Sequence, residues 1–274
     1  MTVRMTFGRA VRSEIVRVRR SPLAAMHLVI ALALGAAAGA YFASSAWDSL
    51  LGADAFFQLL GAGAPLIVGL SCGLSVDTER EAGDCANLLG VPSRRIAFAA
   101  KGAVLLALGF AAALVAAALF WGIVVAAGRD APSLAACLAG ACGSAAGSAA
   151  LYALSLWVAL RFGRNAAIGL GAIGFGVALA SMGGLANGLV TGTLSGSFGA
   201  NAAVFIPFAW PSRFASLAIE LAIAGPLSAG AQVVAVLVDA LARIGIACAV
   251  STIALVAALL VGADRFEDKK RAGE

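Results

Sequence analysis

The stretch that decides the fold is residues 96–127, IAFAAKGAVLLALGFAAALVAAALFWGIVVAA, in which Lys101 is the single charged side chain. A helix needs about 20 mostly apolar residues to cross a hydrocarbon core of about 30 Å, and this stretch is long enough. Two further apolar runs precede it and three follow it. The predicted spans are Leu23–Ala46, Ala55–Val76, Ile96–Ala127, Ala131–Leu160, Asn165–Leu189 and Ala231–Gly262. The sequence therefore predicts an all-α integral membrane protein with six transmembrane helices.

The composition excludes a water-soluble fold. Of the 274 residues, 62% are apolar and 12% are charged, whereas about a quarter of the residues of a soluble domain are charged. A membrane β-barrel would need strands of about ten residues with alternating polarity, and the sequence has no such pattern. The net charge of +5 therefore indicates membrane topology and contact with anionic lipid, and it does not indicate nucleic-acid binding.

The positions of Lys and Arg predict the orientation, because basic connections stay on the cytoplasmic side. Six spans with both termini in the cytoplasm place sixteen of the 19 basic residues on that side, as expected in the cytoplasmic membrane of a bacterium. They are Arg4, Arg9, Arg12, Arg17, Arg19, Arg20, Arg80, Arg94, Arg95, Lys101, Arg161, Arg164, Arg265, Lys269, Lys270 and Arg271. The alternate connections hold Asp48, Asp54, Arg129, Asp130, Arg213 and Glu220.

The N-terminal segment before the first span is basic and amphipathic. Phe7, Val11, Ile15 and Val18 fall on one helical stripe, which predicts a helix lying flat on the membrane surface. A disordered basic leader is the alternative. Signal peptides have apolar regions of about 7–15 residues, and the run from Leu23 is longer, so it is predicted to be a retained helix. One domain results, with an interfacial helix (1–22), a six-span bundle (23–262) and a cytoplasmic tail (263–274).

Small residues recur at helical spacing in two spans. They are Gly35 and Gly39 in the first span, and Gly140, Gly143 and Gly147 in the fourth. Such residues let helices pack closely in lipid. The alternative is that they only reflect a chain rich in Ala and Gly. The glycines at 169, 171 and 174 match a dinucleotide-binding pattern, but they lie inside an apolar span and not after a strand, so no nucleotide site is expected there.

Residues 191–230, between the last two spans, are rich in Gly, Ser, aromatic residues and Pro. We expect short external re-entrant or interfacial helices there, with a solvated loop as the alternative. Asp239 and Arg243, four apart on the last span, share a helix face and either serve function or neutralise each other near the headgroups. The candidate substrate-path residues are Phe205, Phe208, Trp210, Asp239 and Arg243.

Catalytic motifs are missing from the sequence. It contains no HExxH, GxSxG or GxxxxGK[ST] pattern, its five cysteines show no CxxC spacing, and its single histidine, His27, is expected at the interface. We therefore predict no catalytic residues, no metal site and no cofactor bound by this chain.

A charged segment follows the second span: residues 77–101, DTEREAGDCANLLGVPSRRIAFAAK. Asp77, Glu81 and Asp84 fall on one helical face, Gly83 allows close approach of a partner, and Pro92 ends the helix. A solvated loop that only maintains topology is the alternative reading.

Four parts of this segment resemble the cytoplasmic coupling segment of type-2 ABC exporter permeases. They read Glu79-Arg-Glu81-Ala-Gly83, Leu88-Leu89, Pro92-Ser93-Arg94 and Lys101. The likeness is closest to the lantibiotic-immunity permeases, the EpiE/MutE/MutG group. It includes the helix with Ser13-Glu14, the Arg19-Arg20-Ser21-Pro22 entry to the first span, the second span and the external Pro/aromatic segment. The family's usual Gly-Thr reads Gly83-Asp84 here.

The resemblance implies that a cytoplasmic coupling helix between spans 2 and 3 docks on a separate P-loop ATPase subunit that binds ATP and Mg²⁺. The implied coupling residues are Asp77, Glu79, Arg80, Glu81, Gly83, Asp84, Asn87 and Leu88. It also implies a second permease subunit, identical or related, surrounded by membrane lipids. The expected activity is export of a lantibiotic or similar antimicrobial peptide for self-immunity. The alternatives are export of another amphipathic drug or lipid-like substrate, a non-transporting membrane scaffold or immunity protein, and a membrane enzyme with an unrecognised site.

Overall fold

The computed structural model describes residues 5–83, 85–181, 205–228 and 230–264, together with the isolated positions 189, 192 and 194. Within these residues every regular element is a helix, as the sequence predicts. In chain order they are α1 (Phe7–Arg20), α2 (Pro22–Ser44), α3 (Ser49–Glu81), α4 (Ala86–Leu89), α5 (Arg94–Ala126), α6 (Leu134–Phe162), α7 (Arg164–Ser181), the 3₁₀ helix η3 (Pro207–Ala209), α9 (Trp210–Ile223) and α10 (Ala231–Asp264).

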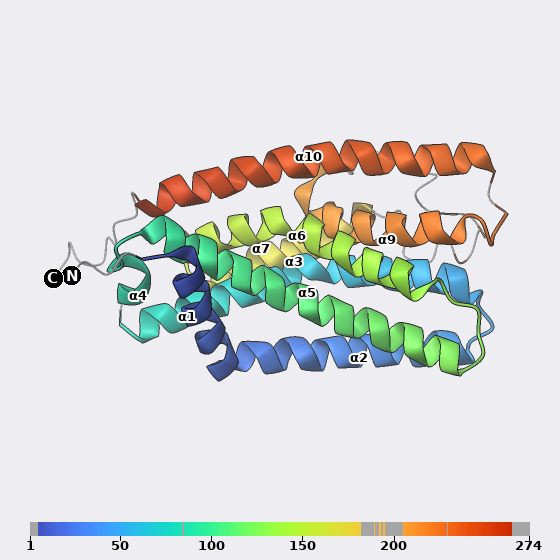
Figure 1. Ribbon diagram of the computed structural model, residues 1–274, viewed down its shortest axis with the longest axis horizontal. Helices are drawn as coiled ribbons and strands as arrows, with labels where there is room; N and C mark the ends of the chain where they lie inside the picture. Colours follow the sequence, from blue (N-terminus) through green and yellow to red (C-terminus); the bar gives the residue numbers. More distant parts are fainter. Residues whose placement is uncertain are drawn as a thin grey trace.

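Six of these helices, α2, α3, α5, α6, α7 and α10, are long and apolar enough to cross a membrane. They run along the long axis of the molecule (Figure 1). The bounds of α2, α5, α6 and α10 agree with the predicted spans to within about three residues. Helix α7 starts one residue before its predicted span, whose last residues at 182–188 lie outside the described residues.

Helix α3 is longer than its predicted span at both ends. The Asp48 carboxylate caps it by accepting hydrogen bonds from the backbone N–H groups of Leu50 and Leu51. Asp54, expected in a connection, lies in the second turn and is 2% exposed. The 33 residues of α3 extend for about 50 Å, more than a hydrocarbon core requires. Its last turn therefore includes Glu79 and Glu81, and only α4 forms a separate helix in the predicted coupling segment.

Glycines set the closest approaches between helices. A Cβ on Gly35 of α2 would lie 2.6 Å from the carbonyl oxygen of Ala116 in α5, and a Cβ on Gly171 of α7 would lie 2.7 Å from that of Pro65 in α3. On α6, Gly143 and Gly147 are equally close to the backbone of α9. The small residues noted in the sequence thus allow close packing inside this chain, and Gly171, from the false dinucleotide motif, packs α7 on α3.

Helix α9 packs among the long helices without being long enough to cross a membrane itself. Its 14 residues extend for about 21 Å. Its first residues, Trp210 and Pro211, lie against Gly147, near the middle of α6. From there it runs beside α3 and α6 toward the end of the bundle where α2 joins α3 (Figure 1). We call this the α9 end, and the opposite end, where α1 and α4 lie, the α1 end.

Helix α1 crosses the α1 end at a steep angle to α2 (Figure 1). Its bounds match the amphipathic segment, but its buried residues are Ala10, Glu14 and Val18. Phe7 and Ile15, from the predicted apolar stripe, are 50% and 43% exposed. The face that packs on the bundle is therefore centred on Glu14, because this carboxylate has partners inside the protein.

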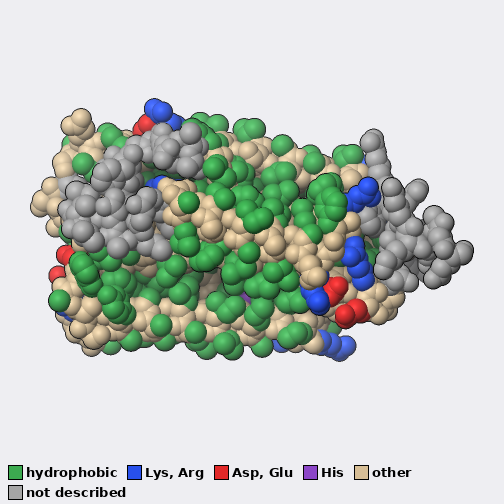
Figure 2. Space-filling model, turned by 180° about the vertical axis from the view of Figure 1, so that it is seen from behind, with side chains coloured by type: hydrophobic (Ala, Val, Ile, Leu, Met, Phe, Trp, Pro, Cys, Tyr) green, Lys and Arg blue, Asp and Glu red, His purple; other side chains and the backbone are tan. Residues whose placement is uncertain are grey.

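Most of the charged side chains in Figure 2 lie toward the two ends of the molecule, and the middle is predominantly apolar. Large apolar side chains are exposed on the long helices, including Leu28, Ile173, Ile246 and Ile253. An exposed apolar belt between charged ends is the surface expected of a protein whose helices are surrounded by lipid.

Candidate functional site

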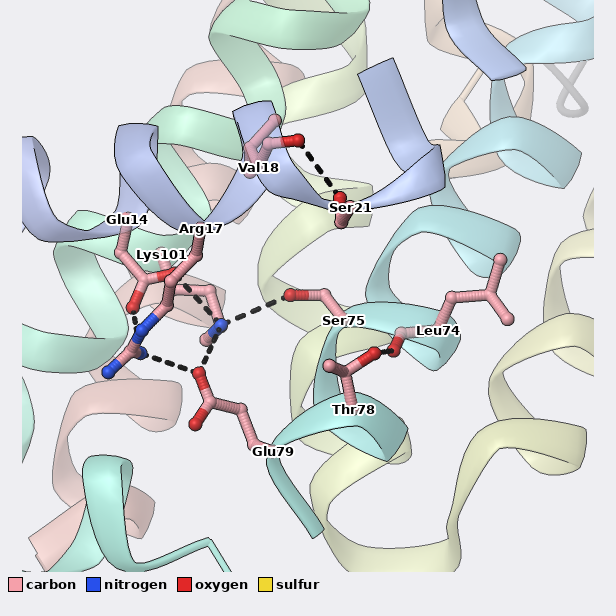
Figure 3. Close-up of polar contacts among 9 residues, drawn as sticks. All are labelled: Glu14, Arg17, Val18, Ser21, Leu74, Ser75, Thr78, Glu79 and Lys101. Atoms are coloured by element: carbon pink, nitrogen blue, oxygen red, sulfur yellow. Dashed lines mark hydrogen bonds and ion pairs between the residues drawn. The ribbon is translucent and has the colours of Figure 1, made fainter. Parts of the chain in front are cut away.

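A network of buried charges joins α1, α3 and α5 at the α1 end (Figure 3). Lys101 Nζ of α5 lies 2.9 Å from Glu14 Oε2 of α1 and 3.2 Å from Glu79 Oε1 of α3, and it donates a hydrogen bond to Ser75 Oγ at 3.1 Å. Arg17 Nη1 completes the network at 2.7 Å from Glu14 and 2.5 Å from Glu79. We call these five residues the ion network.

The ion network is electrically balanced and largely shielded from solvent. Lys101, Glu14 and Glu79 are 2%, 6% and 5% exposed, and Arg17 closes the network on its outer side. Two carboxylates face two cations, so the network carries no net charge. A buried charge must be paired in this way, since removal of one partner leaves the other without solvation.

Two further bonds attach the end of α3 to other helices. Asp77 Oδ2 lies 2.7 Å from Arg164 Nη1 at the start of α7, and Arg80 donates to the carbonyl oxygen of Leu160 near the end of α6. The last two turns of α3 thus have polar bonds to α1, α5, α6 and α7. A displacement of this end of α3 would strain contacts with all four helices.

The structure divides the predicted coupling residues into a buried and an exposed group. Glu79 is in the ion network, and Leu88 is completely buried against Phe98 and Leu160. Glu81 and Gly83 are exposed, and Gly83 has φ +149, a conformation that favours glycine. Asp84 lies outside the described residues, and Asn87 lies in α4.

Sequence reasoning did not assign Glu14, Arg17, Ser75 or Lys101 to a site. Two signals pointed to such a role. Glu14 is the single acid in a basic helix, whose arginines include Arg9, Arg12 and Arg17. Lys101 is the single charged residue inside a long apolar stretch. An isolated charge in an unfavourable setting needs an opposite partner, although the sequence does not say which one.

An apolar cavity of about 260 Å³ lies among α2, α3, α5, α6 and α7. Its walls include Leu34, Leu60 and Phe110, and its polar groups are His27, Ser144, Ser148 and Tyr152. In the view of Figure 2, a hollow with the purple of a histidine side chain opens on the apolar face. The imidazole is already held, with Nδ1 2.8 Å from the Leu23 carbonyl oxygen and Nε2 3.2 Å from Ser71 Oγ. His27 thus lies in the bundle, 2% exposed, and not at an interface.

The five candidate substrate-path residues do not form one site. Trp210 is 1% exposed within the core, Phe205 is 49% exposed, and Phe208 packs against Gly174 of α7. Asp239 and Arg243 form an ion pair of 2.9 Å on an exposed face of α10, with side chains 57% and 58% exposed. None of the five lines the apolar cavity.

Among the described residues, no group of three or more His, Cys, Asp or Glu side chains is arranged to hold a metal ion. Comparison of the chain with protein-family models, with curated proteins and with solved structures finds no match.

Proposed function

We propose that this chain is the transmembrane permease subunit of an ATP-driven exporter, with ATP hydrolysis on a separate P-loop ATPase subunit. The observation that carries the proposal is the attachment of the end of α3. Its last two turns are bonded to α1, α5, α6 and α7, and they lead directly into the exposed residues Glu81 and Gly83. A partner that binds there and moves would displace most of the bundle together, as in rigid-body transitions of packed helices.

In this proposal Glu81, Gly83 and the connection to α5 contact the ATPase on the cytoplasmic side. Glu79 has a different role, because its carboxylate is enclosed by Arg17 and Lys101. It transmits the displacement from the docking surface to α1 and α5. The basic residues of α1 and of the connections at the α1 end support the cytoplasmic orientation, with both termini on that side of a bacterial cytoplasmic membrane.

The positions of the short helices α1 and α9 are compatible with the proposed exporter. Helix α1 directs Phe7 and Ile15 away from the bundle, which suits a helix at the headgroup level of the inner leaflet. Helix α9 starts halfway along α6 and returns to the α9 end, which suits an external re-entrant segment. The exposed apolar belt leaves room for a second permease subunit as well as for lipid.

The proposed substrate is an amphipathic antimicrobial peptide of the lantibiotic type, removed from the membrane so that the producing cell is protected. The apolar cavity supports an amphipathic substrate, because its walls are mostly apolar and include a few polar groups. Another amphipathic drug or a lipid-like molecule would meet the same requirement. A second permease subunit would be needed to complete a pathway.

The charge reversal Glu81→Lys tests the proposal. Glu81 is exposed, so the variant should insert and fold normally, but a lysine at the docking surface should repel the basic partner groups that an acid attracts. We expect loss of ATPase co-purification and of peptide resistance in cells that express both subunits. Asp130→Lys is the matched control, since Asp130 is an exposed acid at the α9 end, and it should retain both.

Three results would contradict the proposal. Unchanged resistance and co-purification in Glu81→Lys would exclude docking at this surface. Protection by a complex whose ATPase is catalytically inactive would indicate a scaffold or immunity protein without transport. An activity of the purified chain that needs no ATP would indicate an enzyme.

A further inference from the structure

A second group of buried ionisable side chains lies between α3 and α9, far from the ion network. Asp54 of α3 is 2% exposed, and Glu220 of α9 has no exposed surface. The two carboxyl groups are near enough to interact by a hydrogen bond as well as by their charges. Two adjacent acids in a membrane protein's interior need an explanation, because ionisable groups at such positions are expensive and often mark proton or ion sites.

The other polar partners of Asp54 are neutral. Ser216 Oγ of α9 donates to Asp54 Oδ1 at 2.6 Å, and Gln58 Nε2 of α3 donates to Asp54 Oδ2 at 2.7 Å. Both donors are themselves buried. They orient the carboxyl group of Asp54 between the two helices, but they add no positive charge that would balance a second carboxylate.

One cation interacts with both acids. Arg213 lies on the same helix as Glu220, two turns earlier, and is attracted by both carboxyl groups. Burial lowers the pKa of Arg213, and Glu220 and Asp54 oppose that shift, so the guanidinium stays charged. Its Nη2 also donates to the carbonyl oxygen of Ser181.

The helices packed around this site supply no further balancing charge in the described part of the chain. Helix α6, which packs on both α3 and α9, contributes the buried thiol of Cys137 to the same core. On α10, Asp239 and Arg243 are paired with each other at an exposed face. Two ionised carboxylates and one guanidinium would therefore leave one buried negative charge without compensation, which is strongly unfavourable.

We propose that Asp54 and Glu220 hold one proton between them and so form a protonated carboxyl pair that joins α3 to α9. The bound proton makes the site neutral together with Arg213 and turns like-charge repulsion into a hydrogen bond. Loss of the proton would leave two carboxylates in contact and would weaken the attachment of α9. The proton site does not depend on whether the chain is a transporter.

Helix α3 connects this site to the ion network, since Glu79 lies at the opposite end of the same helix. If α3 shifts relative to α9, the distance between Asp54 and Glu220 changes, and with it the affinity for the proton. Such coupling is reciprocal, so proton binding must also favour one position of α3.

Infrared difference spectroscopy of the purified full-length protein in lipid nanodiscs tests the proposal. At neutral pH the wild type should show the carbonyl stretch of a protonated carboxyl group, with the small shift expected in deuterium oxide. Asp54→Asn and Glu220→Gln should each remove this band, because the remaining acid then pairs with Arg213 as a carboxylate. Asp239→Asn is the control and should leave the band unchanged. Absence of the band from the wild type at neutral pH would overturn the proposal without requiring any variant to fold.

The pH dependence of stability gives a second, independent measurement. The folded state retains a proton that the unfolded chain releases. The folding equilibrium constant of the wild type should therefore fall, by up to about tenfold per pH unit, as the pH rises above the ordinary carboxyl pKa of about 4, relative to Glu220→Gln. Equal slopes for the two proteins would contradict a shared proton. Stabilisation of the wild type by Na⁺ but not by K⁺, without the infrared band, would also overturn the proposal and would assign the site to a sodium ion.

Discussion

Of the two cations in the ion network, Lys101 is the more costly to bury, because it is 2% exposed and lies on a predominantly apolar helix. Its ammonium group balances Glu14 and Glu79, and Arg17 alone cannot. We expect Lys101→Met to destabilise the protein by about 3–5 kcal/mol, since the variant leaves a buried carboxylate without a partner. Reversible unfolding in mixed detergent micelles measures this change.

Two further variants separate charge pairing from the loss of a lysine side chain. Arg12→Met removes an exposed cation from α1 and should change stability by less than about 0.5 kcal/mol. The double variant Lys101→Met with Glu79→Gln restores the charge balance between Glu14 and Arg17, so it should be more stable than the two single effects added together. Strict additivity would show that these side chains do not act as a network.

The residues of the ion network also show where sequence reasoning stops. Lys101 and Glu14 are 87 positions apart, and no local pattern relates them. Glu79 was predicted to contact an external partner, because an acid in a short charged segment is usually exposed. Its burial depends on the direction that the last turn of α3 takes beneath α1, and this direction is a property of the packed bundle.

The long helices were predictable because each crossing requires a continuous apolar run, and the run is visible in the sequence. Helices α3 and α9 were predicted less completely, because charged residues interrupt their apolar runs. Asp54, Arg213 and Glu220 interrupt apolar runs, so they were assigned to connections, yet the structure buries Asp54 and Glu220 where α3 meets α9. Polar residues that satisfy one another inside a bundle cannot be distinguished locally from residues in a solvated loop.

The crossing of α2 and α5 depends on Gly35. Because a Cβ at this position would meet the Ala116 backbone at 2.6 Å, Gly35→Leu should force the helices apart and destabilise the protein by at least about 1–3 kcal/mol. Gly122→Ala in α5 is the matched control, since a Cβ there has nothing within 4 Å. It should stabilise the helix by about 0.5–1 kcal/mol. Unfolding measurements that show equal effects for the two variants would contradict close packing at this crossing.

At the scale of the whole molecule, α3 is the helix on which both polar sites depend. The proton site lies near its start and the ion network at its end, and α7 and α9 pack on its length. The other long helices are less buried than α3, and α10 is the least buried of the six. A signal between the two ends of the molecule therefore has its most direct physical route along α3.

An ATPase subunit can move the end of α3 only if the α1 end faces the cytoplasm. Cysteine labelling tests this orientation. Ala82 and Ala127 are both exposed, Ala82 beyond the end of α3 at the α1 end and Ala127 beyond the end of α5 at the α9 end. In a variant whose five native cysteines are replaced by alanine, a membrane-impermeant maleimide added to intact cells should label Ala127→Cys and leave Ala82→Cys unmodified. Inverted membrane vesicles should give the reverse result. Labelling of Ala82→Cys in intact cells would place the docking surface outside the cell, where no ATP-hydrolysing subunit could reach it.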